Sequence, residues 1–77
     1  MKTHHYHVYL RPEKEGGYTV TVPALPGCIT FGKTVEEARM MADDAIRAYL
    51  TSLEQHGEPL LTDTDTMLIS VDVVARA

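Results

Sequence analysis

A helix start in the middle of the chain separates two kinds of apolar pattern. Thr34-Val35-Glu36-Glu37 is a capping box, in which the Thr34 hydroxyl is expected to accept a hydrogen bond from the Glu37 amide. We expect the Glu37 carboxylate to reach back to the Thr34 amide, and its charge favours a helix N-terminus. Apolar residues alternate before this point and recur at spacings of three and four after it. The change of period predicts strands followed by a covering helix, which is an α+β fold.

Three strand-like segments precede the helix. Residues 5–11 and 18–22 alternate between apolar and polar side chains, which is typical of half-buried strands. Gly16-Gly17 between them can supply the positive φ of a hairpin turn. Two prolines within residues 23–27 interrupt the pattern, and a short third strand over residues 28–31 follows. These segments predict an antiparallel meander.

The helix is predicted over residues 34–54, and His56-Gly57 with Pro59 two residues later predicts its end. A helix of ~22 residues spans roughly 33 Å, whereas a strand of five or six residues spans roughly 17–20 Å. We therefore expect the helix to extend beyond the sheet. Leu60, Leu61 or a second subunit would have to cover its last turns.

Alternation returns after a polar loop over residues 62–66. Residues 67–74 place four apolar side chains on one face, which predicts a last strand. A helical crossover before that strand places it parallel to an earlier one. The residues expected to be buried are Tyr6 or Val8, Leu10, Val20, Val22, Ala38, Ala42, Ala45, Tyr49, Ile69, Val71 and Val73.

The composition indicates the cellular compartment and the class of binding partner that we expect. The 77 residues contain one cysteine, Cys28, so no disulfide can form within the chain. No apolar run approaches the ~20 residues of a membrane span, and the N-terminus lacks the apolar stretch of a signal peptide. We therefore expect a cytoplasmic protein. The net charge is −4 and Lys and Arg never cluster, which argues against direct nucleic-acid binding and favours a basic protein partner.

The stretch from Tyr18 to Ala45 resembles the HicB antitoxin family. The shared features are Gly-Gly-Tyr at 16–18, the run from Val22 to Cys28, the helix start from Gly32 to Ala38, Asp44-Ala45, and Glu58-Pro59 after the helix. The resemblance implies a single HicB-like domain over residues 1–77. It also implies a βββαβ partial RNase H-like fold, with a four-stranded mixed sheet in the order 3-2-1-4 and the helix on one face.

The resemblance further implies a HicA-like toxin, a small basic ribonuclease, as the partner, and it implies self-association. We expect a homodimer or a higher homo-oligomer. Many family members bind operator DNA through a C-terminal helix-turn-helix or ribbon-helix-helix segment. This chain reaches Ala77 just after the predicted last strand and shows no such segment, so no direct DNA binding is expected.

The predicted contact residues lie on the sheet face that the helix leaves open and in the loop after strand two. Tyr9, Ile29 and Phe31 are expected on the open face, as contacts to a toxin or to a second copy. Pro23, Leu25 and Pro26 are expected to contribute from the loop, and Met41 from the helix as an adaptable contact.

Catalysis is not expected. RNase H-type chemistry needs a carboxylate in the first strand, and residues 5–10 contain none. We interpret Asp63, Asp65 and Asp72 as solvent-facing, and Cys28 as a small buried hydrophobe. No cofactor is implied. Two alternatives stay open: a homo-oligomeric structural or regulatory module without a toxin, and a metal-assisted hydrolase whose ligands would include His5 and His7.

Overall fold

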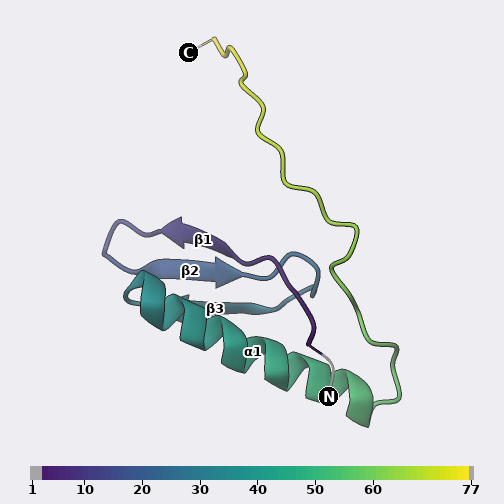
Figure 1. The fold of residues 1–77 in the computed structure, drawn as a ribbon. Helices are drawn as coiled ribbons and strands as arrows, with labels where there is room; N and C mark the ends of the chain where they lie inside the picture. Colours follow the sequence, from purple (N-terminus) through teal and green to yellow (C-terminus); the bar gives the residue numbers. More distant parts are fainter. Residues whose placement is uncertain (1–2, 77) are drawn as a thin grey trace.

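The computed structural model describes residues 3–76, which form three strands and one helix (Figure 1). The strands are β1 (Tyr9–Pro12), β2 (Tyr18–Thr21) and β3 (Ile29–Gly32), and the helix is α1 (Val35–Gln55). Helix α1 lies along one face of the sheet and packs on β3 and β2 (Figure 1). No helix within residues 3–76 is long and apolar enough to cross a membrane.

The sheet is an antiparallel meander in the order β1-β2-β3, which confirms the predicted hairpins. β1 begins at Tyr9, four residues later than the pattern predicted, because its partner strand ends at Thr21. Beyond that point the Val22 amide donates to the Cys28 carbonyl, 3.1 Å away, and Pro23 has no amide to donate. The ladder therefore stops where the loop of residues 22–28 closes on itself.

The helix begins where the capping box predicts. The Glu37 amide donates to the Thr34 hydroxyl at 3.0 Å, and Thr34 has the extended backbone of an N-cap. The Glu37 carboxylate accepts from the amide of Lys33 at 3.0 Å, one residue earlier than expected. The helix ends at Gln55, and Gly57 follows with φ of 66°, a conformation that glycine adopts without a side-chain clash.

Two clusters of buried residues form the core. The first joins Val20 of β2 to Ala38 and Ala42 of the helix, and the second consists of Val22, Leu25 and Cys28. Burial of Val20, Val22, Ala38 and Ala42 confirms part of the predicted core. The other members predicted on the strands and helix lie half-buried around the two clusters: Tyr6, Val8, Leu10, Ala45 and Tyr49.

Helix and sheet meet most closely at Gly32. A Cβ atom built on Gly32 would lie 2.4 Å from the backbone nitrogen of Ala38, a distance that real side chains do not reach. Only glycine therefore allows β3 to pass under the first turns of the helix without moving the backbone. Ala38 and Ala42 complete this contact because their side chains are small.

The helix is longer than the strands it covers, as predicted. Its 21 residues correspond to about 31 Å at 1.5 Å per residue. The second half packs against Leu25 of the loop after β2, Tyr6 before β1 and Leu61 after the helix. Segments outside the sheet, including the predicted Leu61, therefore share a cluster with the helix as far as Leu50, and most of its last five residues are exposed.

The predicted fourth strand and the sheet order 3-2-1-4 are wrong. The sheet has three strands, and residues 64–76 form an extended segment that runs away from both layers (Figure 1). Ile69, Val71 and Val73, predicted to be buried, are exposed. Alternation specifies an extended conformation, but it does not specify which strand edge the segment joins. We call residues 64–76 the arm.

Candidate functional site

The sheet face opposite the helix carries a patch of exposed apolar side chains. Tyr9 and Ile29 both pair with Thr21 in neighbouring strands, and Phe31 pairs with Thr19. Directly paired residues point to the same side of a sheet, and Val20 points to the helix side, so these three share the open face. Tyr9 is 53% exposed, Ile29 62% and Phe31 45%. We call these three residues the open-face patch.

The open-face patch consists of two aromatic side chains and one aliphatic side chain. An aromatic ring at each end flanks an aliphatic side chain, and Thr19 and Thr21 separate them along β2. The Phe31 ring lies over Gly17, since a Cβ atom on that glycine would come within 2.4 Å of the ring. Aromatic side chains of this kind offer a large contact area and lose little conformational entropy on binding.

The three contact residues predicted in the loop after β2 differ in their exposure to solvent. Pro23 and Pro26 are exposed, whereas Leu25 is fully buried in the second core cluster. The Leu25 amide donates to the Val22 carbonyl and the Cys28 amide donates to the Leu25 carbonyl, both at 3.0 Å. Leu25 therefore fixes the loop and offers no contact surface, while the two prolines remain accessible beside the sheet.

The helix also ties this loop in place. The Tyr49 hydroxyl donates to the Pro26 carbonyl at 2.8 Å.

Met41 lies on the helix, which covers the face opposite the open-face patch. The structure thus brings together Tyr9, Ile29 and Phe31, with Pro23 and Pro26 at the end of the sheet, but it does not bring Met41 to them.

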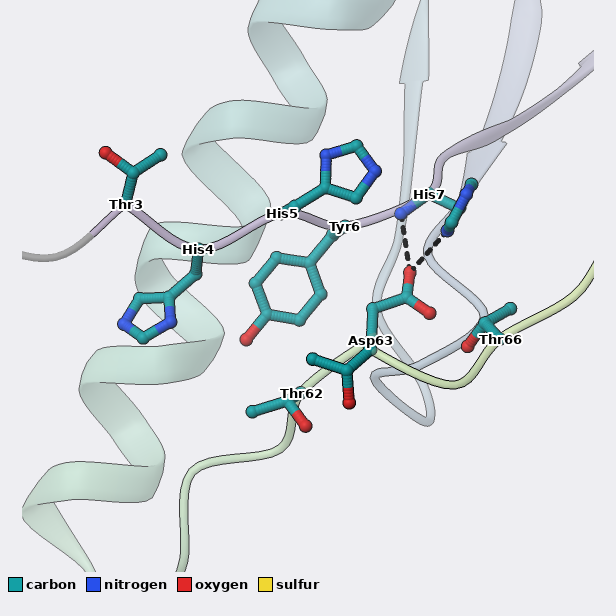
Figure 2. A pocket seen from close by; sticks show the side chains of 9 residues that line it. Thr3, His4, His5, Tyr6, His7, Thr62, Asp63 and Thr66 are labelled. Atoms are coloured by element: carbon teal, nitrogen blue, oxygen red, sulfur yellow. Dashed lines mark hydrogen bonds and ion pairs between the residues drawn. The ribbon is translucent and has the colours of Figure 1, made fainter.

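Apart from the open-face patch, a polar cluster joins the segment before β1 to the segment after the helix (Figure 2). The His7 amide donates to Asp63 Oδ2 at 2.6 Å, and His7 Nδ1 lies 3.0 Å from the same oxygen. The Tyr6 hydroxyl donates to the Leu61 carbonyl. We call these four residues, Tyr6, His7, Leu61 and Asp63, the clasp. It holds the chain in place up to the point where the arm begins.

Electrostatics agree with this geometry. The His7 amide, followed by the Thr66 side chain and the His7 ring, lowers the pKa of Asp63 from 3.8 to about 2. Burial, and then the negative charge of Asp63, raises the pKa of Tyr6. Asp63 therefore stays ionised and acceptor-only across the physiological pH range.

Sequence reasoning missed the clasp. Asp63 was expected in solvent, but its side chain is buried against His7. It lies in the run Thr62-Asp63-Thr64-Asp65-Thr66, where nothing local distinguishes it from Asp65. Only the fold, which places position 63 beside position 7, could identify it.

The residues considered for chemistry are not gathered into a reactive site. The His5 and His7 rings lie edge to face with centroids 5.0 Å apart, and His7 is engaged by Asp63. Within residues 3–76, no three His, Cys, Asp or Glu side chains come together as a metal site would require. Cys28 is buried, and burial raises the pKa of its thiol, which lowers its reactivity at neutral pH.

Comparisons with known proteins extend over most of the chain. The family model described as the HicB-like antitoxin of bacterial toxin–antitoxin systems matches residues 6–73. A UPF0150 protein of Thermoplasma acidophilum is 48% identical over 58 residues, which are 75% of this chain and 84% of that protein. A UPF0150 protein of Synechocystis is 39% identical over 57 residues, 74% of this chain and 72% of that protein.

One relative carries a functional name. Antitoxin HicB 1 of Photorhabdus laumondii is 48% identical over 46 residues, which are 60% of this chain but 30% of that antitoxin. Membership of an antitoxin family indicates a regulatory protein. The match over residues 6–73 includes the sheet, the helix, the clasp and most of the arm, and it shows that this chain belongs to the HicB-like antitoxin family.

Proposed function

We propose that this chain is an antitoxin that binds a small basic ribonuclease toxin of the HicA type and blocks its RNA-cleaving site. Family membership supports the antitoxin role. The observation that carries the proposed binding mode is the open-face patch, where Tyr9, Ile29 and Phe31 are exposed on the sheet face opposite the helix. Exposed apolar groups of this kind are typical of protein interfaces.

Charge supports the same partner. The chain carries a net charge of −4, whereas an enzyme that binds RNA presents a basic surface to its substrate. An acidic protein bound there competes with the RNA through charge as well as through bulk. Because RNA-cleaving toxins act where RNA is translated, the proposal places this antitoxin in the cytoplasm.

The exposed prolines extend the proposed interface beyond the open-face patch. Pro23 and Pro26 present a loop that is held by the buried Leu25 and by the Tyr49 hydroxyl. A loop fixed in this way loses little conformational entropy on binding. Leu25 and Met41, both expected at the interface, are left out of it, because one is buried and the other lies on the helix side.

A binding and inhibition experiment tests the proposal. The probe is the purified product of a small basic reading frame beside this gene, and the measurements are its Kd by calorimetry and its RNA cleavage. We expect Phe31→Asp to weaken binding about thirtyfold, equivalent to ~2 kcal/mol for an apolar hot spot, and to restore cleavage. Met40→Asp, an exposed position on the helix, is the matched control and should bind like the wild type. Equal binding by both variants would contradict the proposal.

The same patch suits a second function, a homo-oligomeric module without a toxin, because Tyr9, Ile29 and Phe31 could equally contact a second copy. This candidate predicts that Phe31→Asp converts an oligomer to the monomer mass of 8.6 kDa. The lack of any basic reading frame beside the gene would favour it. An oligomer that survives Phe31→Asp would remove it.

A further inference from the structure

The arm exposes more apolar surface than any other segment that the structure describes. Its six large apolar side chains, Met67, Leu68, Ile69, Val71, Val73 and Val74, are 72–102% exposed. Those at 67, 69, 71 and 73 alternate with their neighbours and would share one face of an extended strand. None of the sheet pairings within residues 3–76 involves the arm. The arm therefore has the pattern of a buried strand without a partner in its own chain.

A groove lies between the helix and the segment of residues 3–10, which leads into β1. It has a volume of about 840 Å³, and its apolar lining comes from Val8 and Leu10 on one side and from Val35, Ala42, Ile46 and Leu50 on the other. The ion pair between Arg47 and Asp43, at 2.8 Å, lies on the helix side of the groove. The groove thus combines these apolar side chains with polar ones, which come from Thr3, His4, His5 and His7 on one side and from Arg39, Asp43 and Arg47 on the helix.

The groove and the arm also match in length and hydrogen-bonding capacity. From Val35 to Leu50 the helix rises about 22 Å, and an extended segment from Met67 to Val73 spans about 20 Å. β1 is an edge of the sheet, so one side of it presents unpaired backbone amides and carbonyls beside the groove. An extended arm could satisfy those groups while its apolar face enters the groove.

We infer that the groove between residues 3–10 and α1 receives the arm of a second copy of this chain, by reciprocal exchange between two protomers. We call the sheet and helix, with their connecting loops, the body. The arm leaves the body after the clasp and runs away from the sheet and the helix (Figure 1). A twofold exchange buries two arms and two grooves in one association. Asp72, on the other face of the arm, then shares the open side of the sheet with Arg11 of the neighbouring strand.

The inference goes beyond the proposed function and assigns self-association to a different surface from the open-face patch. A dimer formed through arms leaves Tyr9, Ile29 and Phe31 free for a toxin. Failure of the two proposals is therefore distinguishable, because arm variants test the dimer and Phe31→Asp tests toxin binding. A toxin that contacts the arm instead would appear as toxin binding lost in the arm variants.

Light scattering at micromolar concentration tests the exchange on the full chain. We expect the wild type at twice the monomer mass of 8.6 kDa and the Ile69→Asp/Val71→Asp variant at the monomer mass. Val74→Asp adds a charge on the other face of the arm and should remain dimeric, as the matched control. Circular dichroism should show an unchanged helix in each variant, because the side chains of Ile69, Val71 and Val74 are exposed in their own chain.

Three results would overturn the inference. A wild type that scatters light as a monomer would exclude the exchange of arms. This holds even if the amides of the arm are protected from hydrogen exchange with solvent. A dimer that persists in the Ile69→Asp/Val71→Asp variant would place the interface elsewhere. A dimer that Phe31→Asp dissociates and the arm variant does not would assign self-association to the open-face patch.

Discussion

β2 and the arm carry nearly the same kind of sequence and have opposite surroundings. Tyr18-Thr19-Val20-Thr21-Val22 and Ile69-Ser70-Val71-Asp72-Val73 both alternate β-branched and polar residues. Val20 and Val22 are 0% and 1% exposed, whereas Val71 and Val73 are 72% and 78% exposed. The difference lies in what faces each segment: β2 has a strand on each side and a helix over it, and the arm has neither among residues 3–76. Burial is therefore a property of the partner surface as much as of the pattern.

The largest effect on the free energy of unfolding should come from truncating a buried side chain of the body. The smallest should come from the same truncation of an exposed side chain in the arm. Leu25→Ala empties a fully buried site in the second core cluster and should lower the free energy of unfolding by about 2–5 kcal/mol. Leu68→Ala in the arm should change it by less than about 0.5 kcal/mol in the monomer. Urea denaturation at submicromolar concentration measures both. Similar losses at the two positions would contradict the distinction between body and arm.

The next largest effect should come from enlarging a small residue at the helix–sheet contact. Ala42→Leu should cost about 1–3 kcal/mol, because Ala42 is buried against Val20 and has no space for a larger side chain. Ala48→Leu is the matched control, since Ala48 is exposed on the same helix. Thermal denaturation should show a lower Tm for the first variant alone. If both variants melt like the wild type, the assigned helix face is incorrect.

The body was largely predictable because its signals are local. The helix cap at Thr34, the glycines of the hairpin and the helical spacing each act within a few residues, and the structure contains all three. The Glu37 carboxylate accepts from the Lys33 amide instead of the predicted Thr34 amide. The arm and the clasp were not predictable, because both depend on what lies across space. Asp63 differs from Asp65 only in facing His7, and residues 67–74 differ from β2 only in having no facing helix. Tertiary partners, not periodicity, decide these two cases.

A smaller effect should come from the helix start itself. Thr34→Ala removes the acceptor of the Glu37 amide and should cost about 1 kcal/mol. Thr51→Ala, at an exposed position within the helix, should be neutral or slightly stabilising because alanine favours helices. Equal melting temperatures for the wild type and Thr34→Ala would show that the cap does not stabilise the body.

The clasp should make stability depend on pH in the acidic range. The pKa of Asp63 is lowered from 3.8 to about 2, so the unfolded chain takes up a proton at a higher pH than the folded chain does. The stabilisation by Asp63 is present above pH 4 and is lost as the pH falls from about 4 to 2. Asp63→Asn keeps an acceptor for the His7 amide but should flatten this part of the profile. An identical slope in both proteins between pH 4 and 2 would show that Asp63 makes no such contribution.

Amide hydrogen exchange, followed residue by residue at low and high protein concentration, tests the comparison of body and arm most directly. Exchange protection reports local opening, so each segment is measured separately in the same sample. We expect the amides of Val20 and Val22 to be protected at both concentrations. The amides of residues 67–74 should exchange freely at submicromolar concentration and become protected at high micromolar concentration, as a second copy binds the arm. Protection of the arm that does not change with concentration would show that the arm folds onto its own body and would contradict the account.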